Sequence, residues 1–550
     1  MSRCIVRQAA RLLLVIFMAA SAFAPAHAQE IYQHVKNTDI YDFVDELANV
    51  GVIDINSAIK PYSRKFIAQK LAEASGKREE LNARQMKDLD FYLLDFNKEL
   101  KPDKNFKKRL DLLYYKDTLF TFSFNPILGM SVYNNDSGSF YHRWNGAEAY
   151  AYVGEHFGFY ASLRDNHESK RMSDPTYLNQ NDASNYKVDT KGGGDFDEMR
   201  GGLTYTWKWG SLGLVKDHMV WGDNYHGSNI LSGHQPSFTM LKLHLQPVRW
   251  FDFNYIHGWL VSDVVDSSRS YVNGQSLRKV YRQKYIAANM FTFTPWRKFQ
   301  FSIGNSIIYS DQDVQPAYLV PFFFYKTVDH AQTSTGSNFL GQNSQLFFNI
   351  SSRNLKNVHL YASVFVDEIA LSRATDKDKH TNFYSLKAGL HLSNLGLDNL
   401  FFTAEYTRTN PLAYRHYIES ATYASSSYNM GHYLGDNSEE GYVCIGYRPI
   451  SKLKVEASYT LASKGYEYAY TGVSSDPIGN GLGKPFLNRV YWQMKSIELK
   501  AHYQIVNDAW IFAGLESSDC TGKSNELNTY TMPEYIGKLT TINVGANIGF

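Results

Sequence analysis

The end of the chain alternates between two kinds of residue, and this alternation restricts the fold more than any other feature. The apolar positions are Ile542, Val544, Ala546, Ile548 and Phe550, and the small or polar positions between them are Thr541, Asn543, Gly545, Asn547 and Gly549. Successive residues of a β-strand point to opposite faces of the sheet. An apolar face opposite a small, polar face is typical of a transmembrane barrel strand, which separates lipid from a lumen. The pattern therefore predicts an all-β transmembrane barrel.

The same alternation recurs upstream, and we expect about 18 antiparallel strands, with 16 to 20 possible, in a barrel over residues 117–550. Brief polar links such as 154–158, 210–211 and 247–249 alternate with longer polar segments. This asymmetry is typical of periplasmic turns and extracellular loops. Because charges are costly on the lipid face, charged rows such as Lys454 with Glu456 are expected to point into the lumen. A soluble β-sandwich or propeller is the alternative fold.

The N-terminus predicts export. Three arginines precede the apolar stretch 12–24, which is followed by Ala26-His27-Ala28, so residues 1–28 are expected to be a cleaved signal peptide. The aromatic Phe550 resembles the C-terminal signal through which the barrel-assembly machinery recognises its substrates. Together these features predict an outer-membrane protein in contact with outer-membrane lipid.

Residues 29–116 are expected to form a small periplasmic helical segment. Apolar residues at spacings of three and four mark three amphipathic helices between residues 39 and 100. Gly51 is placed to end the first helix, and Pro61 with Ser63 to open the second. The residues 47–53, 61–64 and 68–71 are also similar to a single S-layer-homology module. The alternative is a plain helical cap on the barrel.

Composition and motifs argue against several functions. Lys plus Arg total 56 against 54 for Asp plus Glu, which argues against nucleic-acid binding. Three Cys residues make neither a disulfide framework nor a four-cysteine metal site. The sequence contains no nucleophile elbow, no His-Glu-x-x-His and no phosphate loop. We therefore expect no enzymatic activity, no metal and no cofactor, with an outer-membrane hydrolase as a distant alternative because His, Asp and Ser mix in residues 217–234.

The predicted outer loops are rich in aromatic residues, which stack on sugar rings. They are Trp221, Tyr225, Tyr318, Phe322, Phe323, Phe324, Tyr325, Tyr414, Tyr417, Tyr423, Tyr428 and Tyr433. One segment, expected where the fifth strand leaves the membrane, combines such rings with polar groups. Its candidate glycan-binding residues are Asp217, Trp221, Asp223, Tyr225 and His226. The alternative is that these aromatics form an interface girdle and loop packing.

Four stretches of the sequence resemble the Wzi capsule-assembly family. They are residues 216–223 with 228–232, residues 360–362, residues 367–369, and residues 405–411 with Tyr414. The resemblance spans roughly residues 110–550, and it brings Arg408 and Tyr414 among the glycan-binding candidates. It implies an 18-stranded outer-membrane barrel behind a helical bundle. It also implies a lectin-like, non-enzymatic role in retaining capsular or other surface polysaccharide. A porin-like channel or transporter is the main alternative function.

Overall fold

The computed structural model describes residues 29–100, 106–183, 185–188, 192–333, 341–369, 382–468 and 484–549. The predicted signal peptide, residues 1–28, and the C-terminal Phe550 lie outside these residues, so both assignments stay predictions.

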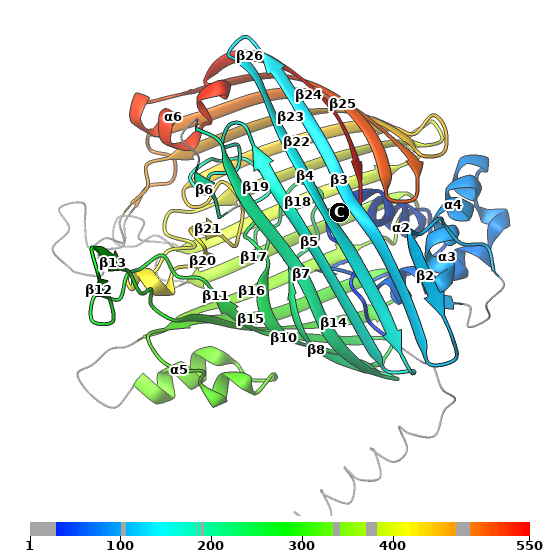
Figure 1. Cartoon of the computed structure of the whole chain (residues 1–550), viewed down its shortest axis with the longest axis horizontal. Coiled ribbons are helices and arrows are strands. Elements are labelled where there is room, and N and C mark those ends of the chain that lie inside the picture. Colours follow the sequence, from blue (N-terminus) through cyan, green and yellow to red (C-terminus); the bar gives the residue numbers. More distant parts are fainter. Residues whose placement is uncertain are drawn as a thin grey trace, which may run out of the picture.

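Eighteen antiparallel strands close into a barrel, which confirms the predicted fold (Figure 1). The barrel strands are β3 (Phe120–Asn135), β4 (Gly138–Val153), β5 (Phe157–Glu168), β7 (Gly194–Trp207), β8 (Gly210–Asp217), β10 (Phe238–Val248), β11 (Phe251–Leu260), β14 (Lys284–Trp296), β15 (Phe299–Ser310), β16 (Asn343–Ser352), β17 (Val358–Glu368), β18 (Phe383–Ser393), β19 (Leu400–Thr409), β22 (Ser438–Tyr447), β23 (Leu453–Gly465), β24 (Val490–Val506), β25 (Ala509–Gly522) and β26 (Gly537–Ile548). The ring closes where residues 542–548 of β26 pair with residues 128–134 of β3. Further along the same edge, the short β2 (Leu113–Lys116) pairs with β3.

The two faces of the wall differ as the alternation predicts. Ile542 and Val544 of β26 are 52% and 50% exposed on the outer face. The residue between them, Asn543, turns to the lumen and accepts a hydrogen bond from Ser131 Oγ at 3.3 Å. Lys454 also points inward, which confirms the predicted direction of its charged row, and its Nζ lies 2.7 Å from Asp42 Oδ2. No helix among the described residues has both the length and the apolar character needed to cross a membrane.

Three helices precede the barrel, as predicted: α2 (Thr38–Val50), α3 (Arg64–Ser75) and α4 (Ala83–Leu100). Gly51 ends α2 with a φ of 92°, and Ser63 caps α3 by accepting a hydrogen bond from Phe66 N. The apolar stripes of the three helices pack together around Leu47, Ile67 and Leu89, all fully buried. The other helical elements among the described residues are short: η1 (Arg78–Glu80), η2 (Pro316–Leu319), α5 (Tyr325–Thr333), η4 (Glu419–Ala421), α6 (Ser524–Tyr530) and η5 (Pro533–Tyr535).

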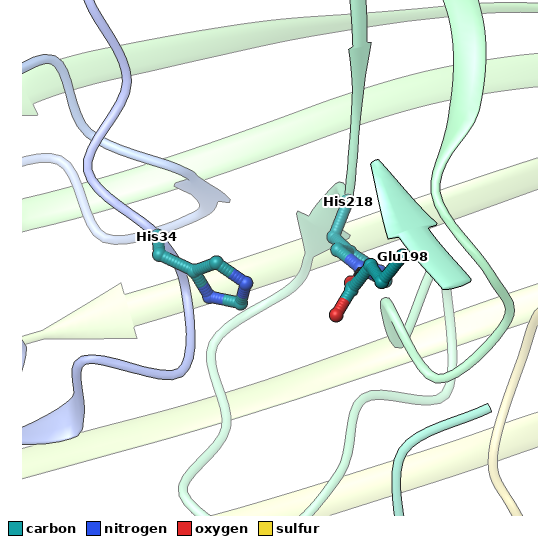
Figure 2. A group of neighbouring side chains, drawn as sticks. All are labelled: His34, Glu198 and His218. Carbon is teal, nitrogen blue, oxygen red and sulfur yellow. Dashed lines mark hydrogen bonds and ion pairs between the residues drawn. The ribbon is translucent and has the colours of Figure 1, made fainter. Parts of the chain in front are cut away.

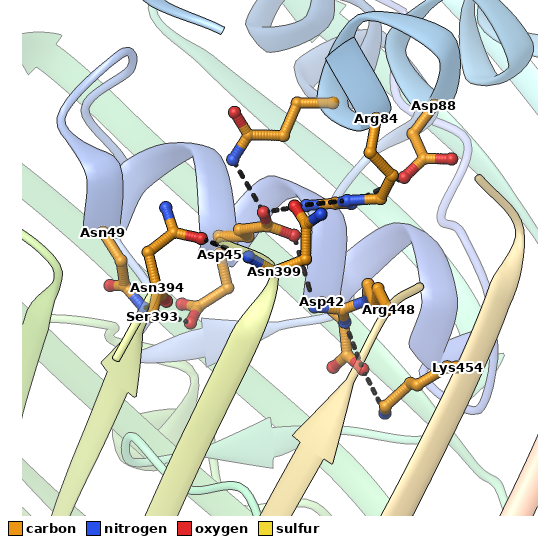
Figure 3. A network of polar contacts seen from close by, with 12 residues as sticks. Asp42, Asp45, Asn49, Arg84, Asp88, Ser393, Asn394, Asn399, Arg448 and Lys454 are labelled. Atoms are coloured by element: carbon orange, nitrogen blue, oxygen red, sulfur yellow. Dashed lines mark hydrogen bonds and ion pairs between the residues drawn. The ribbon is translucent and has the colours of Figure 1, made fainter. Parts of the chain in front are cut away.

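The three helices cap the end of the barrel at which the strands are joined by short turns. Figure 3 shows polar residues of α2 and α4 facing the turns and strand ends below them. Asp42 lies between Lys454 and Arg448, and Arg448 also reaches Glu46 at 3.2 Å. Arg84 of α4 donates to Asn399 Oδ1 at 2.9 Å. We call this the short-turn end and the opposite end, which carries the longer connections, the long-loop end.

Candidate functional site

The connection between β8 and β10, residues 218–237, turns into the lumen and is called the plug loop here. Within it, β9 (Val220–Trp221) pairs with β1 (Ile59–Lys60) of the N-terminal segment. Gly222 N donates to Ala58 O at 2.8 Å, and Trp221 N donates to Leu231 O at 2.8 Å. Two segments far apart in sequence therefore form one small sheet inside the barrel.

An apolar core joins this small sheet to the barrel wall. Its members include Ile31, Ala58 and Ile59 of the N-terminal segment, Trp221, Ile230 and Leu231 of the plug loop, and Met240, Ile256, Ile286, Phe347 and Phe365 of the wall. Burial of this many apolar side chains is strongly stabilising, at about 25 cal/mol for each Å² removed from water. The lumen at this level is therefore packed like a protein interior.

Trp221 belongs to this core. It is 1% exposed, and its ring meets the edge of Phe347 at a centroid distance of 5.8 Å. Asp217, at the end of β8, is likewise buried, and it pairs with Arg200 Nε at 2.7 Å and accepts from Tyr160 OH at 2.8 Å. The segment therefore lies in the lumen, whereas the sequence led us to expect an outer loop. A glycan contact by Trp221 requires the plug loop to leave the lumen.

The next two candidates fasten the plug loop to the barrel wall and to the helical cap. Asp223 and Asn349 of β16 exchange two hydrogen bonds, of 3.0 and 2.7 Å. Tyr225 OH donates to Asp45 of α2 and lies 2.9 Å from His359 Nδ1. The plug loop thus crosses from the strand end of β8 to the helices at the short-turn end.

Asp45 is the point where the plug loop, the helical cap and the wall meet. Arg353, in the turn after β16, pairs with Asp45 and also donates to Asn49 Oδ1 at 2.8 Å. Burial opposes ionisation of Asp45, but Arg353, two nearby histidines and the hydrogen bond from Tyr225 together outweigh it and hold the pKa of Asp45 well below its usual range. Asp45 is therefore a carboxylate throughout the physiological pH range.

Glu405 of β19 holds the following turn of the plug loop. Its two carboxylate oxygens accept from Tyr225 N at 2.6 Å and His226 N at 3.0 Å. Lys387 Nζ lies 2.6 Å from the same carboxylate, and both side chains are almost fully buried. His226 then stacks on Tyr442, with ring centroids 3.8 Å apart.

The two remaining candidates lie apart from one another. Tyr414, in the connection 410–437, is buried and donates to Asn229 O of the plug loop at 2.7 Å. Glu405 and Thr407 of β19 face the lumen. Arg408 directly follows Thr407, so it faces the outside of the wall, where its guanidinium lies 3.8 Å from the centre of the Phe486 ring. The structure therefore gathers six of the seven candidates inside the barrel, four of them buried and two partly buried, and leaves Arg408 on the outside. Their role in binding a glycan stays a prediction.

Sequence reasoning missed the partners of these residues, namely Asp45, Asn349, Arg353, His359, Lys387 and Glu405. The inward direction of Lys387 and Glu405 follows from strand alternation. Nothing in the local sequence indicates that a loop near residue 225 reaches them.

One group of potential metal ligands occurs among the described residues: His34, Glu198 and His218 (Figure 2). His218 Nδ1 lies 3.1 Å from Gly233 O and therefore carries a proton, which leaves Nε2 facing Glu198 at 2.5 Å. His34 Nδ1 accepts from Lys36 N at 3.0 Å. A proton between His218 Nε2 and Glu198 accounts for their hydrogen bond. The three side chains therefore form a polar link between the N-terminal segment and the wall. The absence of a metal site stays a prediction.

No curated protein sequence gives a significant match to this chain. The sequence model of the capsule assembly protein Wzi matches residues 129–507. Among solved structures, one similar chain is described as Wzi, a carbohydrate-binding β-barrel of the outer membrane involved in group 1 capsule assembly in Escherichia coli. It is 13% identical, with a TM-score of 0.57, over 95% of this chain and 100% of that one. This likeness shows the fold.

Barrels of Pseudomonas aeruginosa are also similar in part. OpdK, solved with vanillate, is 9% identical over 78% of this chain and 98% of its own, with a TM-score of 0.44. OprD is 10% identical over 78% of this chain and 94% of its own, with a TM-score of 0.40.

The buried pair Lys387–Glu405 gives a first prediction. Lys387→Met leaves the Glu405 carboxylate buried without a cation, and we expect the barrel to lose about 3–5 kcal/mol of unfolding free energy. The side chains of Lys500 and Glu498 are 57% and 27% exposed, so Lys500→Met should change stability by no more than about 1 kcal/mol. Urea unfolding of each variant in lipid vesicles measures these changes in unfolding free energy. Equal stability of the two variants contradicts the assignment, and adding Glu405→Gln to Lys387→Met should restore part of the loss.

Asp436 gives a second prediction, on pH. Its Oδ1 accepts from Tyr414 N at 2.8 Å, and burial raises its pKa to about 6 although Arg415 and Lys464 act to lower it. A raised pKa means that the native state favours the protonated acid. This contribution to stability is complete below the ordinary pKa of 3.8 and is lost as the pH rises through about 6.

We therefore expect amide exchange in residues 410–437, corrected for its intrinsic pH dependence, to be slower at pH 4 than at pH 7. The loss amounts to about 3 kcal/mol for a shift of roughly two pKa units. Asp436→Asn keeps the acceptor oxygen and should remove this pH dependence. Persistence of the full dependence in Asp436→Asn contradicts the role given to this carboxyl.

Proposed function

Because the chain belongs to the Wzi family of capsule assembly proteins, we propose that this outer-membrane barrel binds polysaccharide and retains it at the cell surface, without catalysing a reaction on it. In this proposal the long-loop end faces outward and the helical cap, residues 29–116, faces the periplasm. The carbohydrate binding described for the Escherichia coli protein supports the choice of ligand.

The packing of the N-terminal segment and the plug loop inside the barrel is the observation that carries this proposal. A ring of eighteen strands is wide enough for an aqueous channel. Here, however, the N-terminal segment and the plug loop pack against the wall around Trp221, Ile230 and Phe347. This packing argues against a porin-like channel. It favours the long-loop end as the surface that binds a ligand. It also argues against a hydrolase in residues 217–234, since Asp217 and Asp223 are each occupied by protein partners.

A hairpin at the long-loop end exposes an aromatic ring and a guanidinium, whereas the buried candidates expose no such pair of groups to a ligand. It consists of β12 (Tyr271–Asn273) and β13 (Ser276–Arg278), joined by a turn at Gly274 with a φ of 64°. Tyr271 pairs with Arg278, and Val272 pairs with Leu277. Cross-strand partners share a face, so one face carries an aromatic ring beside a guanidinium and the other carries two aliphatic side chains.

The charge of this hairpin favours an acidic polysaccharide. Residues 266–282 contain four cations and one carboxylate, a net charge of 4 − 1 = +3. A tyrosine ring stacks on the apolar face of a pyranose, while a guanidinium binds a carboxylate through two hydrogen bonds. Weak contacts of this kind add up along a polymer.

This packing inside the barrel gives a third prediction. Full-length protein in planar bilayers should show little conductance, and replacing residues 219–236 with a short Gly-Ser link should produce large, stable steps because the plug loop is gone. Replacing residues 267–280, which lie outside the lumen, with a two-residue turn is the control and should leave the conductance low. Large steps in the unaltered protein would favour the porin alternative.

The hairpin gives a fourth prediction. Tyr271→Ala combined with Arg278→Glu should lower binding of a uronic-acid polymer, polygalacturonate, to purified protein by roughly tenfold or more, since a good charge-assisted contact is worth about 1.5–3 kcal/mol. Val272→Ser with Leu277→Ser alters the opposite face of the same hairpin and should have little effect.

The outcomes separate the two parts of this proposal. If the unaltered protein binds neither polygalacturonate nor neutral dextran, polysaccharide binding itself is wrong. If it binds dextran equally well, the preference for an acidic polymer is wrong. If both double variants bind like the parent, the hairpin is not the contact.

A further inference from the structure

The described residues of a second long connection, 311–333 and 341–342 between β15 and β16, do not enter the lumen. Its helical elements η2 and α5 lie on the outside of the barrel (Figure 1). Tyr318 and Tyr325 of this connection pack against Phe253, Tyr255, Tyr285 and Tyr309. These wall residues alternate with Ile256, Ile286 and Ile308, which face the luminal core, so they belong to the outer face.

Two asparagines on the outer face hold the connection in place. Asn289 Nδ2 donates to Pro321 O at 2.8 Å and to Phe323 O at 2.9 Å. Asn305, its neighbour across the strands, accepts from Tyr325 N at 2.9 Å. Tyr255 OH donates to Tyr318 O at 2.9 Å.

These bonds lie near the middle of the barrel strands. Asn289 is the sixth of the 13 residues of β14, and Asn305 is the seventh of the 12 residues of β15. An irregular backbone at this depth is tolerated only when its polar groups are satisfied, because hydrocarbon offers them no partner. An asparagine on the lipid face is costly for the same reason. The two asparagines therefore satisfy polar backbone groups of the connection, and these groups satisfy the asparagine side chains.

Between residues 319 and 324 the connection exposes an apolar surface. Leu319, Phe322, Phe323 and Phe324 are 39%, 55%, 43% and 44% exposed. Phe322 also stacks on Phe253, near the short-turn end of β11, with ring centroids 4.6 Å apart. The neighbouring strands β16 and β17 expose Ile350 and Leu360 on the same outer face, so the four side chains continue the apolar surface that the barrel presents to lipid.

We propose that residues 316–325, the outer-wall segment, lie within the membrane and bind lipid acyl chains through Leu319 and Phe322–Phe324. The segment is then part of the surface that contacts lipid, although it is a connection by sequence. This inference does not depend on polysaccharide binding.

The test places a spin label on the segment in full-length protein reconstituted into phosphatidylcholine vesicles. The label is attached at Phe323→Cys in a chain in which the two buried cysteines, Cys444 and Cys520, are replaced by serine. Collision with oxygen reports hydrocarbon, and collision with a water-soluble nickel complex reports water. Leu499→Cys on the outer face of β24 and Val272→Cys on the exposed hairpin are the two references.

The proposal expects the label at residue 323 to behave like the label at residue 499: accessible to oxygen and protected from nickel. Accessibility to nickel equal to that at residue 272 overturns it, because the segment then lies in water. Protection from both reagents also overturns it, because a protein partner or a second copy of the chain then covers the segment.

A second variant tests how the segment is held. Asn289→Leu with Asn305→Leu removes the bonds to Pro321, Phe323 and Tyr325, so the label at residue 323 should gain access to nickel. Asn543→Leu makes the same change on the luminal face of β26 and should not alter the label. Unchanged labelling in the double variant shows that the asparagines do not hold the segment.

Discussion

The ion pair between Asp45 and Arg353 connects the three parts of this molecule. Asp45 belongs to the helical cap, Arg353 to a turn of the wall, and Tyr225 of the plug loop donates to the same carboxylate. Two opposite charges buried together are stable only when hydrogen bonds satisfy their remaining donors and acceptors. Asn49 and Ser57 accept the other guanidinium hydrogens at 2.8 and 2.9 Å. The cap, the plug loop and the wall thus meet at this ion pair.

Much of the barrel could be predicted because strand alternation is a local property. Each strand displays its two faces within about ten residues, and the short links show where it reverses. The helices of the cap could be predicted equally well, since Gly51 marks the end of one helix and Ser63 the start of the next in the sequence. The alternation also separates Arg408 from Glu405 and Thr407, so it already places this candidate on the opposite face.

The course of the long connections could not be predicted in the same way. Trp221 and Tyr225 were expected in an outer loop because aromatic and polar residues are mixed there. Their partners Phe347, Asp45 and Glu405 lie more than a hundred residues away in the chain, and nothing near residue 221 indicates them. The position of Tyr318 and Phe322 could not be predicted for the same reason. Their connection follows the outer wall because it contacts Asn289 and Phe253, which are distant in sequence. Composition alone does not distinguish a loop in water from one packed inside or alongside the barrel.

The pairing of β1 with β9 has a consequence for the order of biosynthetic events. Residues 59–60 precede the whole ring in sequence, yet they are enclosed by it and hydrogen-bonded to the loop that follows β8. The seam between β3 and β26 joins the first barrel strand to the last, so it forms only after residue 542 has been made. Both partners of the β1–β9 pair precede the last thirteen barrel strands in the chain, so this pair can form inside the curving sheet before the seam closes around it.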